Sequence, residues 1–336
     1  MAINITGLER TISFLEGGRT DHPPFHPIIM RWAAKYAGVK YRDFCTVPAA
    51  KTRAMMMCAS DFDMDWVTVL SDPWAEASAF GIQVKYPEDN LPLVTDSQFP
   101  DANSVSHIKK YDPLNNTRCF NRIEEIKIYS KDAPDKFIVG WIEGPVAEYV
   151  DLRGASNAAV DFLVEPEAVD KTMDVIMESA FDFIRLQVKA GAHCIGIGDA
   201  FCSQIGPELY LKYAFERQRM LVECIHSYEA LAKLHICGDT TDLVQNMIRT
   251  EADIIDIDHL VKDMSSYSSS LGKHQMLSGK CDPVTVIENG DAGIIFKIVE
   301  KDFNDAGGRC IISAGCEITP GTTVEKMKTF RLAANL

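Results

Sequence analysis

The chain has 336 residues, of which 46% are hydrophobic and 24% are charged, as is usual for a globular protein. Its formal net charge of −14 argues against a nucleic-acid or anionic-membrane partner, because either would require a concentrated basic surface. No apolar run has the length of a membrane span and no secretory signal is visible, while ten cysteines without any CxxC pair indicate reduced thiols. We therefore expect a cytoplasmic protein, with a thiol content that suits an anaerobe.

Short β-rich runs alternate with longer helical patterns along the chain, and eight such runs are recognisable. Between two of them, an apolar stripe at helical spacing runs from Met173 to Val188 and ends at Gly191. Eight strand-then-helix units predict an α/β fold of the (β/α)8 TIM-barrel type in a single domain, residues 1–336. The predicted strands are residues 24–30, 65–70, 137–143, 193–199, 231–237, 253–259, 274–279 and 310–315.

Two further segments carry local predictions. Residues 91–135 are less regular and contain four prolines, so we expect an insertion over the barrel or a small cap there. Near the C-terminus, Thr322-Thr-Val-Glu325 fits a capping box that opens the last helix.

Soft metal ligands end two of the predicted strands. His235 and Cys237 are two residues apart on an extended strand, so their side chains point to the same side. Cys316 follows the eighth strand, and the carboxyl ends of barrel strands share one rim. Three protein ligands with an open fourth position are typical of catalytic zinc. The alternative is ordinary core packing, because buried cysteines are most often small inert hydrophobes.

Carboxylates at the same rim are weaker candidates. Asp199 follows Ile195-Gly-Ile-Gly198, which lacks the third glycine of a dinucleotide fingerprint. Asp199 is a candidate to orient a substrate or to hydrogen-bond a ligating histidine, and equally a candidate helix N-cap. Glu143, before Gly144 and Pro145, has the same ambiguity. Three further aspartates lie in the predicted strand 253–259. Asp258, with His259, is predicted to lie nearest the rim, whereas Asp253 and Asp256 are predicted to be solvated or to cap helices.

These motifs resemble the uroporphyrinogen decarboxylase superfamily, and more narrowly its zinc-dependent corrinoid methyltransferase branch, which includes methylcobamide:coenzyme M methyltransferases. The resemblance covers most of the chain. Its main motifs are His235-Ile-Cys237-Gly238, Gly279-Lys-Cys-Asp282-Pro283 and Ser313-Ala-Gly-Cys316-Glu317-Ile-Thr-Pro320. It extends upstream through Ser71-Asp72-Pro73, the segment 76–81, Glu143-Gly144-Pro145 and the strand that ends at Asp199. It implies a barrel with Zn²⁺ at its mouth, held by His235, Cys237 and Cys316. Asp199 and Glu143 are then candidates for substrate positioning or proton management.

Two departures from the family pattern narrow the expected activity. The first-strand loop has one arginine, Arg31, and not the arginine cluster with which the decarboxylase branch grips porphyrin carboxylates. Lys280 stands where the family usually has asparagine, which leaves its role open. No D-x-H-x-x-G pattern of a corrinoid-binding domain occurs, so the corrinoid (cobalamin) must arrive on a separate corrinoid protein.

The expected activity is methyl transfer between that corrinoid and a small molecule. The small molecule is either a methyl donor such as a methoxy compound or a thiol acceptor such as coenzyme M, with a slight preference for the donor. Two alternatives remain from the sequence: a metal-free decarboxylase of the parent superfamily, and a non-catalytic module that binds zinc or a corrinoid protein.

Overall fold

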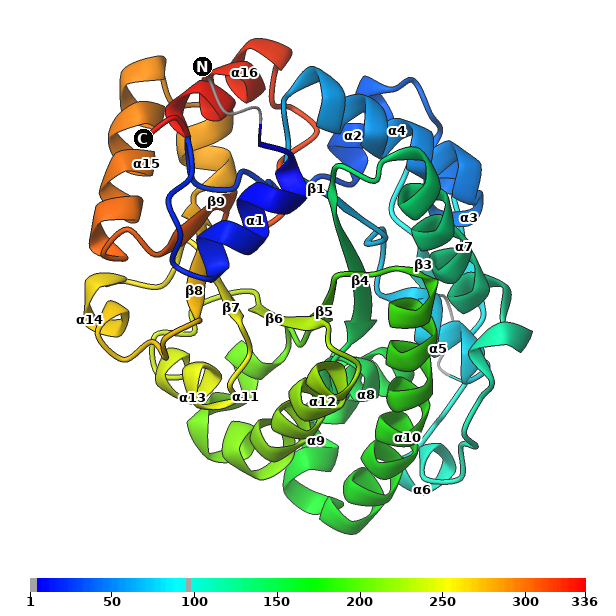
Figure 1. The fold of residues 1–336 in the computed structure, drawn as a ribbon. Helices are drawn as coiled ribbons and strands as arrows, with labels where there is room; N and C mark the ends of the chain where they lie inside the picture. Colours follow the sequence, from blue (N-terminus) through cyan, green and yellow to red (C-terminus); the bar gives the residue numbers. More distant parts are fainter. Residues whose placement is uncertain (1–4, 95–97) are drawn as a thin grey trace.

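The protein is described by a computed structural model over residues 5–94 and 98–336. Within this part of the chain, seven parallel strands form one curved sheet in the order β1-β4-β5-β6-β7-β8-β9, and helices surround it (Figure 1). The strands are β1 (Trp66–Thr68), β4 (Phe137–Glu143), β5 (Cys194–Gly198), β6 (Leu231–Ile236), β7 (Ile254–Ile257), β8 (Met276–Cys281) and β9 (Cys310–Ala314).

A segment around Phe25 closes the ring between the two edge strands. Phe25 forms a parallel bridge with Ile312 of β9, and its carbonyl accepts the amide of Asp65 at 3.0 Å, directly before β1. The predicted first strand, 24–30, is thus reduced to one bridge. Its two prolines, Pro24 and Pro27, explain this, because they have no N–H with which to continue a ladder. The other seven predicted strands are present, and the predicted TIM barrel is confirmed.

The helices fill the connections between strands and form the outer layer (Figure 1). They are α1 (Gly7–Leu15), α2 (Arg31–Tyr36), α3 (Tyr41–Thr46), α4 (Pro48–Asp61), α5 (Trp74–Ala79), α6 (Ala102–Val105), η1 (Pro113–Asn115), α7 (Thr117–Asp132), α8 (Pro145–Arg153), α9 (Ala155–Val164), α10 (Pro166–Ala190), α11 (Cys202–Tyr210), η2 (Leu211–Phe215), α12 (Glu216–Ser227), α13 (Val244–Arg249), α14 (Ser265–Ser268), η3 (Pro283–Glu288), α15 (Ala292–Asp305) and α16 (Val324–Ala333). None of them, within the described ranges, has the length and hydropathy needed to cross a membrane.

The amino-terminal end of the barrel is plugged. Phe14 and Leu15 of α1 belong to a buried cluster with residues at the starts of the strands, among them Trp66, Phe137 and Cys194. In Figure 1, α1 lies across the barrel opening. Because this end is filled with apolar side chains, the polar residues at the carboxyl ends of the strands are the ones free to form a site.

The segment predicted as an insertion or cap, 91–135, contains elements of two kinds. β3 (Leu93–Val94) pairs antiparallel with β2 (Val84–Lys85) outside the barrel sheet. α7 occupies the connection from β1 to β4, and its Tyr129 donates a hydrogen bond to the carbonyl of Thr68 in β1. The part of this segment before α7 is therefore the part that suits a cap, and the cap and the single-domain boundaries remain predictions.

Candidate metal centre

His235 and Cys237 lie at the carboxyl end of β6, as their spacing predicts. β6 pairs with β5 on one side and β7 on the other, so His235 stands opposite Gly198 and Asp256. Its Nε2 is 2.8 Å from Sγ of Cys237, and only 5% of the residue is exposed. The alternation of the strand thus brings an imidazole and a thiol together on the interior side.

Cys316 reaches the same point from the loop after β9. Its Sγ is 3.7 Å from Sγ of Cys237, and one ligand atom from each of His235, Cys237 and Cys316 lies within 4.8 Å of the others. Gly315 permits this approach, because a β-carbon there would lie 2.3 Å from the amide nitrogen of His259. One imidazole and two thiols at this spacing form a donor set that suits zinc with a fourth position open.

A buried ion pair supports His235 from behind. Nδ1 of His235 lies 2.8 Å from Oδ2 of Asp256, and the same oxygen lies 3.0 Å from Nζ of Lys233. Asp256 and Lys233 are each 1% exposed. With Nδ1 beside a carboxylate, Nε2 is the nitrogen next to the Cys237 thiol, an arrangement common in histidines that bind a metal.

The same contacts shift the proton affinities of the ligands. Burial disfavours charged His235, but the carboxylate of Asp256 and the sulfur of Cys316 together outweigh it and raise the His235 pKa to about 9. The hydrogen bond from Cys237 lowers the pKa of the Cys316 thiol, against the opposing effect of burial. The Cys237 pKa is raised by the same hydrogen bond and by burial. One of the two thiols therefore ionises readily before any metal is bound.

Trp141 of β4 lies beside His235, one of the three candidate ligands. Gly196 and Gly198 of β5 have no side chains, and a β-carbon at Gly198 would lie 2.5 Å from the indole of Trp141. That space lets the Trp141 ring lie with its centroid 6.3 Å from the imidazole of His235. The two glycines of β5 thus make room for an indole.

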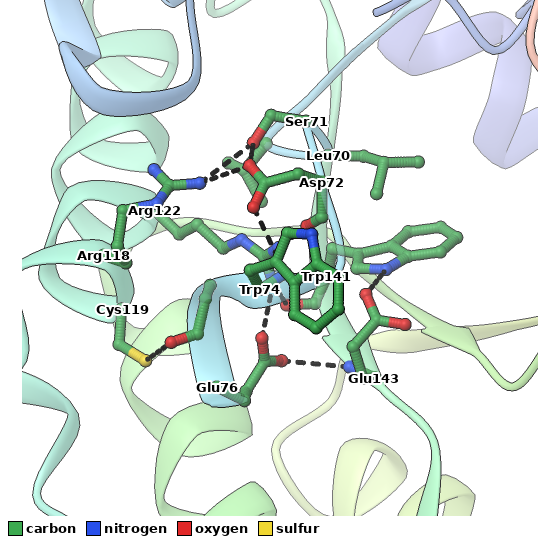
Figure 2. Close-up of polar contacts among 12 residues, drawn as sticks. Leu70, Ser71, Asp72, Trp74, Glu76, Arg118, Cys119, Arg122, Trp141 and Glu143 are labelled. Atoms are coloured by element: carbon green, nitrogen blue, oxygen red, sulfur yellow. Dashed lines mark hydrogen bonds and ion pairs between the residues drawn. The ribbon is translucent and has the colours of Figure 1, made fainter. Parts of the chain in front are cut away.

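Glu143 is tied to this ring and to a buried ionic network (Figure 2). Its Oε1 accepts a hydrogen bond from Nε1 of Trp141 at 3.0 Å, and its amide donates to Glu76 at 2.9 Å. Burial raises the Glu143 pKa well above its usual range, and the charges of Glu76 and Asp151 add to the effect. The Glu143 carboxyl therefore tends to hold its proton, as a proton donor would.

Asp199 is placed differently. It is fully buried, and its two oxygens accept hydrogen bonds from the amide of Ala147 at 2.7 Å and from Nε2 of Gln218 at 2.8 Å. Burial raises its pKa to about 6, although these hydrogen bonds oppose the shift. Ala147 is in the first turn of α8, so Asp199 caps a neighbouring helix, and this geometry favours positioning over substrate contact.

Other residues at the carboxyl ends of the strands form polar contacts that hold the loops around the site in place. Asp258 accepts the amide of Gly238 at 3.0 Å and lies 2.6 Å from Nδ1 of His259. Lys280 donates from Nζ to the carbonyl of Val261 at 2.6 Å, which ties β8 to the loop after β7. Glu317, next to Cys316, accepts the amide of Arg31 at 2.8 Å.

Sequence reasoning missed the partners of His235. The prediction that Asp256 is solvated or capping is wrong, because Asp256 is buried against His235 and Lys233. The signal was a charged residue inside the apolar run Ile254-Ile-Asp256-Ile257, matched by Lys233 in β6. A buried charge of each sign on neighbouring strands indicates an ion pair. Asp253 does not cap a helix either, since it accepts the amide of Ala232 in β6 at 2.7 Å.

Comparisons with known proteins bear on the family and the fold of this chain. A family model described as uroporphyrinogen decarboxylase (URO-D) matches residues 6–335. The methylcobamide:CoM methyltransferase MtbA of Methanosarcina mazei is 29% identical over 271 residues, 78% of this chain and 77% of the relative. The uroporphyrinogen decarboxylase of Thermodesulfovibrio yellowstonii is 23% identical over 334 residues, 95% of each chain. A solved methyltransferase from Methanosarcina mazei has a TM-score of 0.88 at 19% identity, with 98% of both chains covered, and so shares the fold.

Proposed function

The chain belongs to the uroporphyrinogen decarboxylase (URO-D) family, and on that premise we propose that it is a zinc-dependent methyltransferase acting on the corrinoid of a separate corrinoid protein. The observation that carries the proposal is the convergence of His235, Cys237 and Cys316 at the barrel mouth, with their ligand atoms within 4.8 Å. Relatives named methylcobamide:CoM methyltransferase support the corrinoid and the methyl transfer.

The proposed ligands are Nε2 of His235 and the sulfurs of Cys237 and Cys316. Zinc bound there would supply Lewis-acid chemistry, either holding a substrate thiol as its thiolate or polarising the oxygen of a methoxy group. Asp256 keeps Nδ1 of His235 engaged, and the charge of Lys233 in turn compensates Asp256. These two residues hold the imidazole in one orientation while the substrate changes.

Glu143 is proposed to manage a proton at the mouth. Burial raises its pKa well above the usual range and so favours the protonated carboxyl, and Trp141 donates a hydrogen bond to its Oε1. A protonated carboxyl can donate to an alkoxide that leaves when a methoxy compound gives up its methyl group, and can later be reprotonated by solvent. Asp199 is proposed as a positioning residue, because it anchors α8 beside the carboxyl end of β4.

Two directions of methyl transfer are compatible with this proposal: from a methylated donor to the corrinoid, or from the corrinoid to a thiol acceptor such as coenzyme M. The named relatives favour the thiol acceptor, whereas the first-strand loop around Arg31 slightly favours the donor. In both cases the corrinoid is presented by a partner protein, because the sequence has no corrinoid-binding pattern of its own.

A metal-free decarboxylase is the second candidate. It is favoured by the relatives named uroporphyrinogen decarboxylase, which match 95% of the chain where MtbA matches 78%. It is opposed by the single arginine of the first-strand loop, since porphyrin carboxylates call for several cations.

The test is to measure zinc in the purified protein together with methyl transfer from methylcobalamin to thiols, and from methoxy compounds to cobalamin(I). We expect close to one zinc per chain, and loss of both zinc and methyl transfer in Cys316→Ala. Cys224→Ala is the matched control, because Cys224 is a partly exposed thiol on α12 outside the three candidate ligands. A protein without zinc that decarboxylates uroporphyrinogen would overturn the proposal in favour of the second candidate.

A further inference from the structure

A cavity of about 510 Å³ is lined by the connection from β1 to β4 and by the connection from β4 to β5, and none of the three candidate metal ligands lines it. Its lining comes from the start of α5, from β3 and from the end of α8, and includes Trp74, Ile82, Val94, Asp151, Leu152 and Arg153. The volume is that of a site for a small molecule. The lining is mostly apolar, with one aromatic residue and two charged ones.

The cavity adjoins a cluster of carboxylates that has too few cations. Arg118 pairs with Asp72 and Arg122 with Glu76, as Figure 2 shows. In the described part of the chain, no ion pair is formed by the three remaining carboxylates of the cluster, Glu143, Glu148 and Asp151. Each has its pKa raised well above the usual range by burial, and Glu76 raises all three further.

Two members of this cluster have polar atoms with no partner. Glu148 is 1% exposed, and neither of its oxygens has a hydrogen bond within the described ranges. Oδ2 of Asp151 is likewise buried and without a hydrogen bond there. Glu148 and Asp151 are one helical turn apart on α8, so two carboxyls without partners share one face of that helix. Buried carboxyl groups in this state require a proton or a cation.

The one positive charge in the lining does not compensate them. Arg153 donates from Nε to Oδ2 of Asp161 at 2.6 Å and from Nη1 to the carbonyl of Phe99 at 2.6 Å. Its charge is therefore neutralised by Asp161 on α9, and Asp151 is the carboxylate that the cavity offers to a ligand.

We propose that this cavity binds the methylated ammonium group of a small organic cation, with Asp151 as its counter-charge and Trp74 as its aromatic wall. An alkylated ammonium has no compact hydration shell, so apolar walls, an indole and a carboxylate suit it better than they suit a metal ion or an anion. The binding of this cation does not depend on the proposed function, because the cavity shares no residue with the three candidate metal ligands.

The test is calorimetric titration of the full-length protein with three ligands of the same shape and different charge: choline, 3,3-dimethylbutan-1-ol and 3,3-dimethylbutanoate. We expect choline to bind about tenfold or more tightly than the neutral alcohol, and the carboxylate not to bind. This comparison needs no variant, so it stands even where a substitution impairs folding.

Two variants then assign the binding to the cavity. Asp151→Asn and Trp74→Leu are each expected to weaken choline binding about tenfold, with Asp174→Asn, an exposed aspartate on α10, as the unchanged control. Equal affinity for choline and the neutral alcohol, tighter binding of the carboxylate, or full affinity in Asp151→Asn would overturn the inference. Zinc content and methyl transfer are measured on the same samples. Methyl transfer without choline binding removes only this inference, and choline binding without zinc or methyl transfer removes only the proposed function.

Discussion

At the scale of single residues, the Lys233–Asp256–His235 chain is the feature that most constrains the candidate metal centre. All three side chains lie inside the barrel, and Asp256 contacts both of its partners through the same oxygen. Burial opposes the charged form of Asp256, but Lys233 and His235 outweigh it and hold its pKa below the usual range. A permanent negative charge at Nδ1 makes His235 a better and more rigidly held ligand.

We therefore expect Asp256→Asn to weaken zinc binding by about 10- to 100-fold, because the imidazole loses its charged partner. The measurement is competition for zinc with a chromogenic chelator, carried out on folded protein. Asp253→Asn is the matched control, because Asp253 lies just before the same strand and bonds to Ala232 and His226 instead. Zinc affinity that is equal in Asp256→Asn and in the wild type would show that Asp256 does not support the metal.

At the scale of elements, the loop after β9 must approach the loop after β7 closely to deliver Cys316. Gly315 donates its amide to the carbonyl of Cys281 at 2.9 Å, and a β-carbon on it would lie 2.9 Å from the carbonyl carbon of Asp258. These neighbours are backbone atoms, which cannot make room for a β-carbon by a change of side-chain rotamer.

Gly315→Ala is accordingly expected to lower the free energy of unfolding by about 1–3 kcal/mol and to weaken zinc binding, because the Cys316 loop must move. Denaturant unfolding and zinc titration measure the two effects. Gly293→Ala in α15 serves as the control, since its β-carbon would meet only Oδ1 of Asp291 at 3.3 Å and alanine favours helix. Normal zinc affinity in Gly315→Ala would contradict the close-approach argument.

Asp302 on α15 is expected to make the free energy of unfolding depend on pH. The residue is 5% exposed, and its Oδ2 has no hydrogen bond within the described residues. Burial raises its pKa to about 6 from 3.8; Lys280 and Lys301 oppose the shift, and Asp305 adds to it. Because the folded state then binds the proton more tightly than the unfolded state, this group's contribution to stability is lost as the pH rises from about 4 to about 6.

Asp302→Asn is expected to remove that loss and to raise the free energy of unfolding by about 1–2 kcal/mol at about pH 7, with little change at about pH 4. Urea unfolding of both proteins across this range measures the difference. A gap between the two proteins that stays constant with pH would contradict the assignment to Asp302.

The ends of two helices show how well local sequence predicts element boundaries. The end of α10 at Gly191 follows the predicted pattern, because glycine accepts the left-handed conformation seen there, with φ of 115°. The predicted capping box at Thr322 is wrong by one residue: Thr323 is the N-cap, and it accepts the amide of Lys326. Thr322 bonds to Thr319 instead, a contact that local sequence does not reveal.

At the scale of the whole molecule, the barrel and the three candidate ligands were predictable because both depend on strand order. Strand count alone brings the end of β9 to the rim that carries the end of β6. The partners across the strands were not predictable, since Asp256 meets His235 through a pairing register that no single-strand pattern contains. The same limit applies to the cavity beside Asp151, whose walls come from two connections, β1 to β4 and β4 to β5.

Removal of the metal tests whether zinc joins the ends of β6 and β9 in the folded protein. The proposed ligands come from two strands that are separate in the sheet order, so zinc would bind the folded barrel far better than the unfolded chain. Binding to the folded state alone stabilises a protein by about 2.7 kcal/mol when free zinc is one hundred times its dissociation constant. We therefore expect chelation to lower the midpoint of thermal unfolding, added zinc to restore it, and Cys316→Ala to show neither effect. If chelation left the wild-type midpoint unchanged while zinc was demonstrably removed, His235, Cys237 and Cys316 would not be joined by a metal in the native barrel.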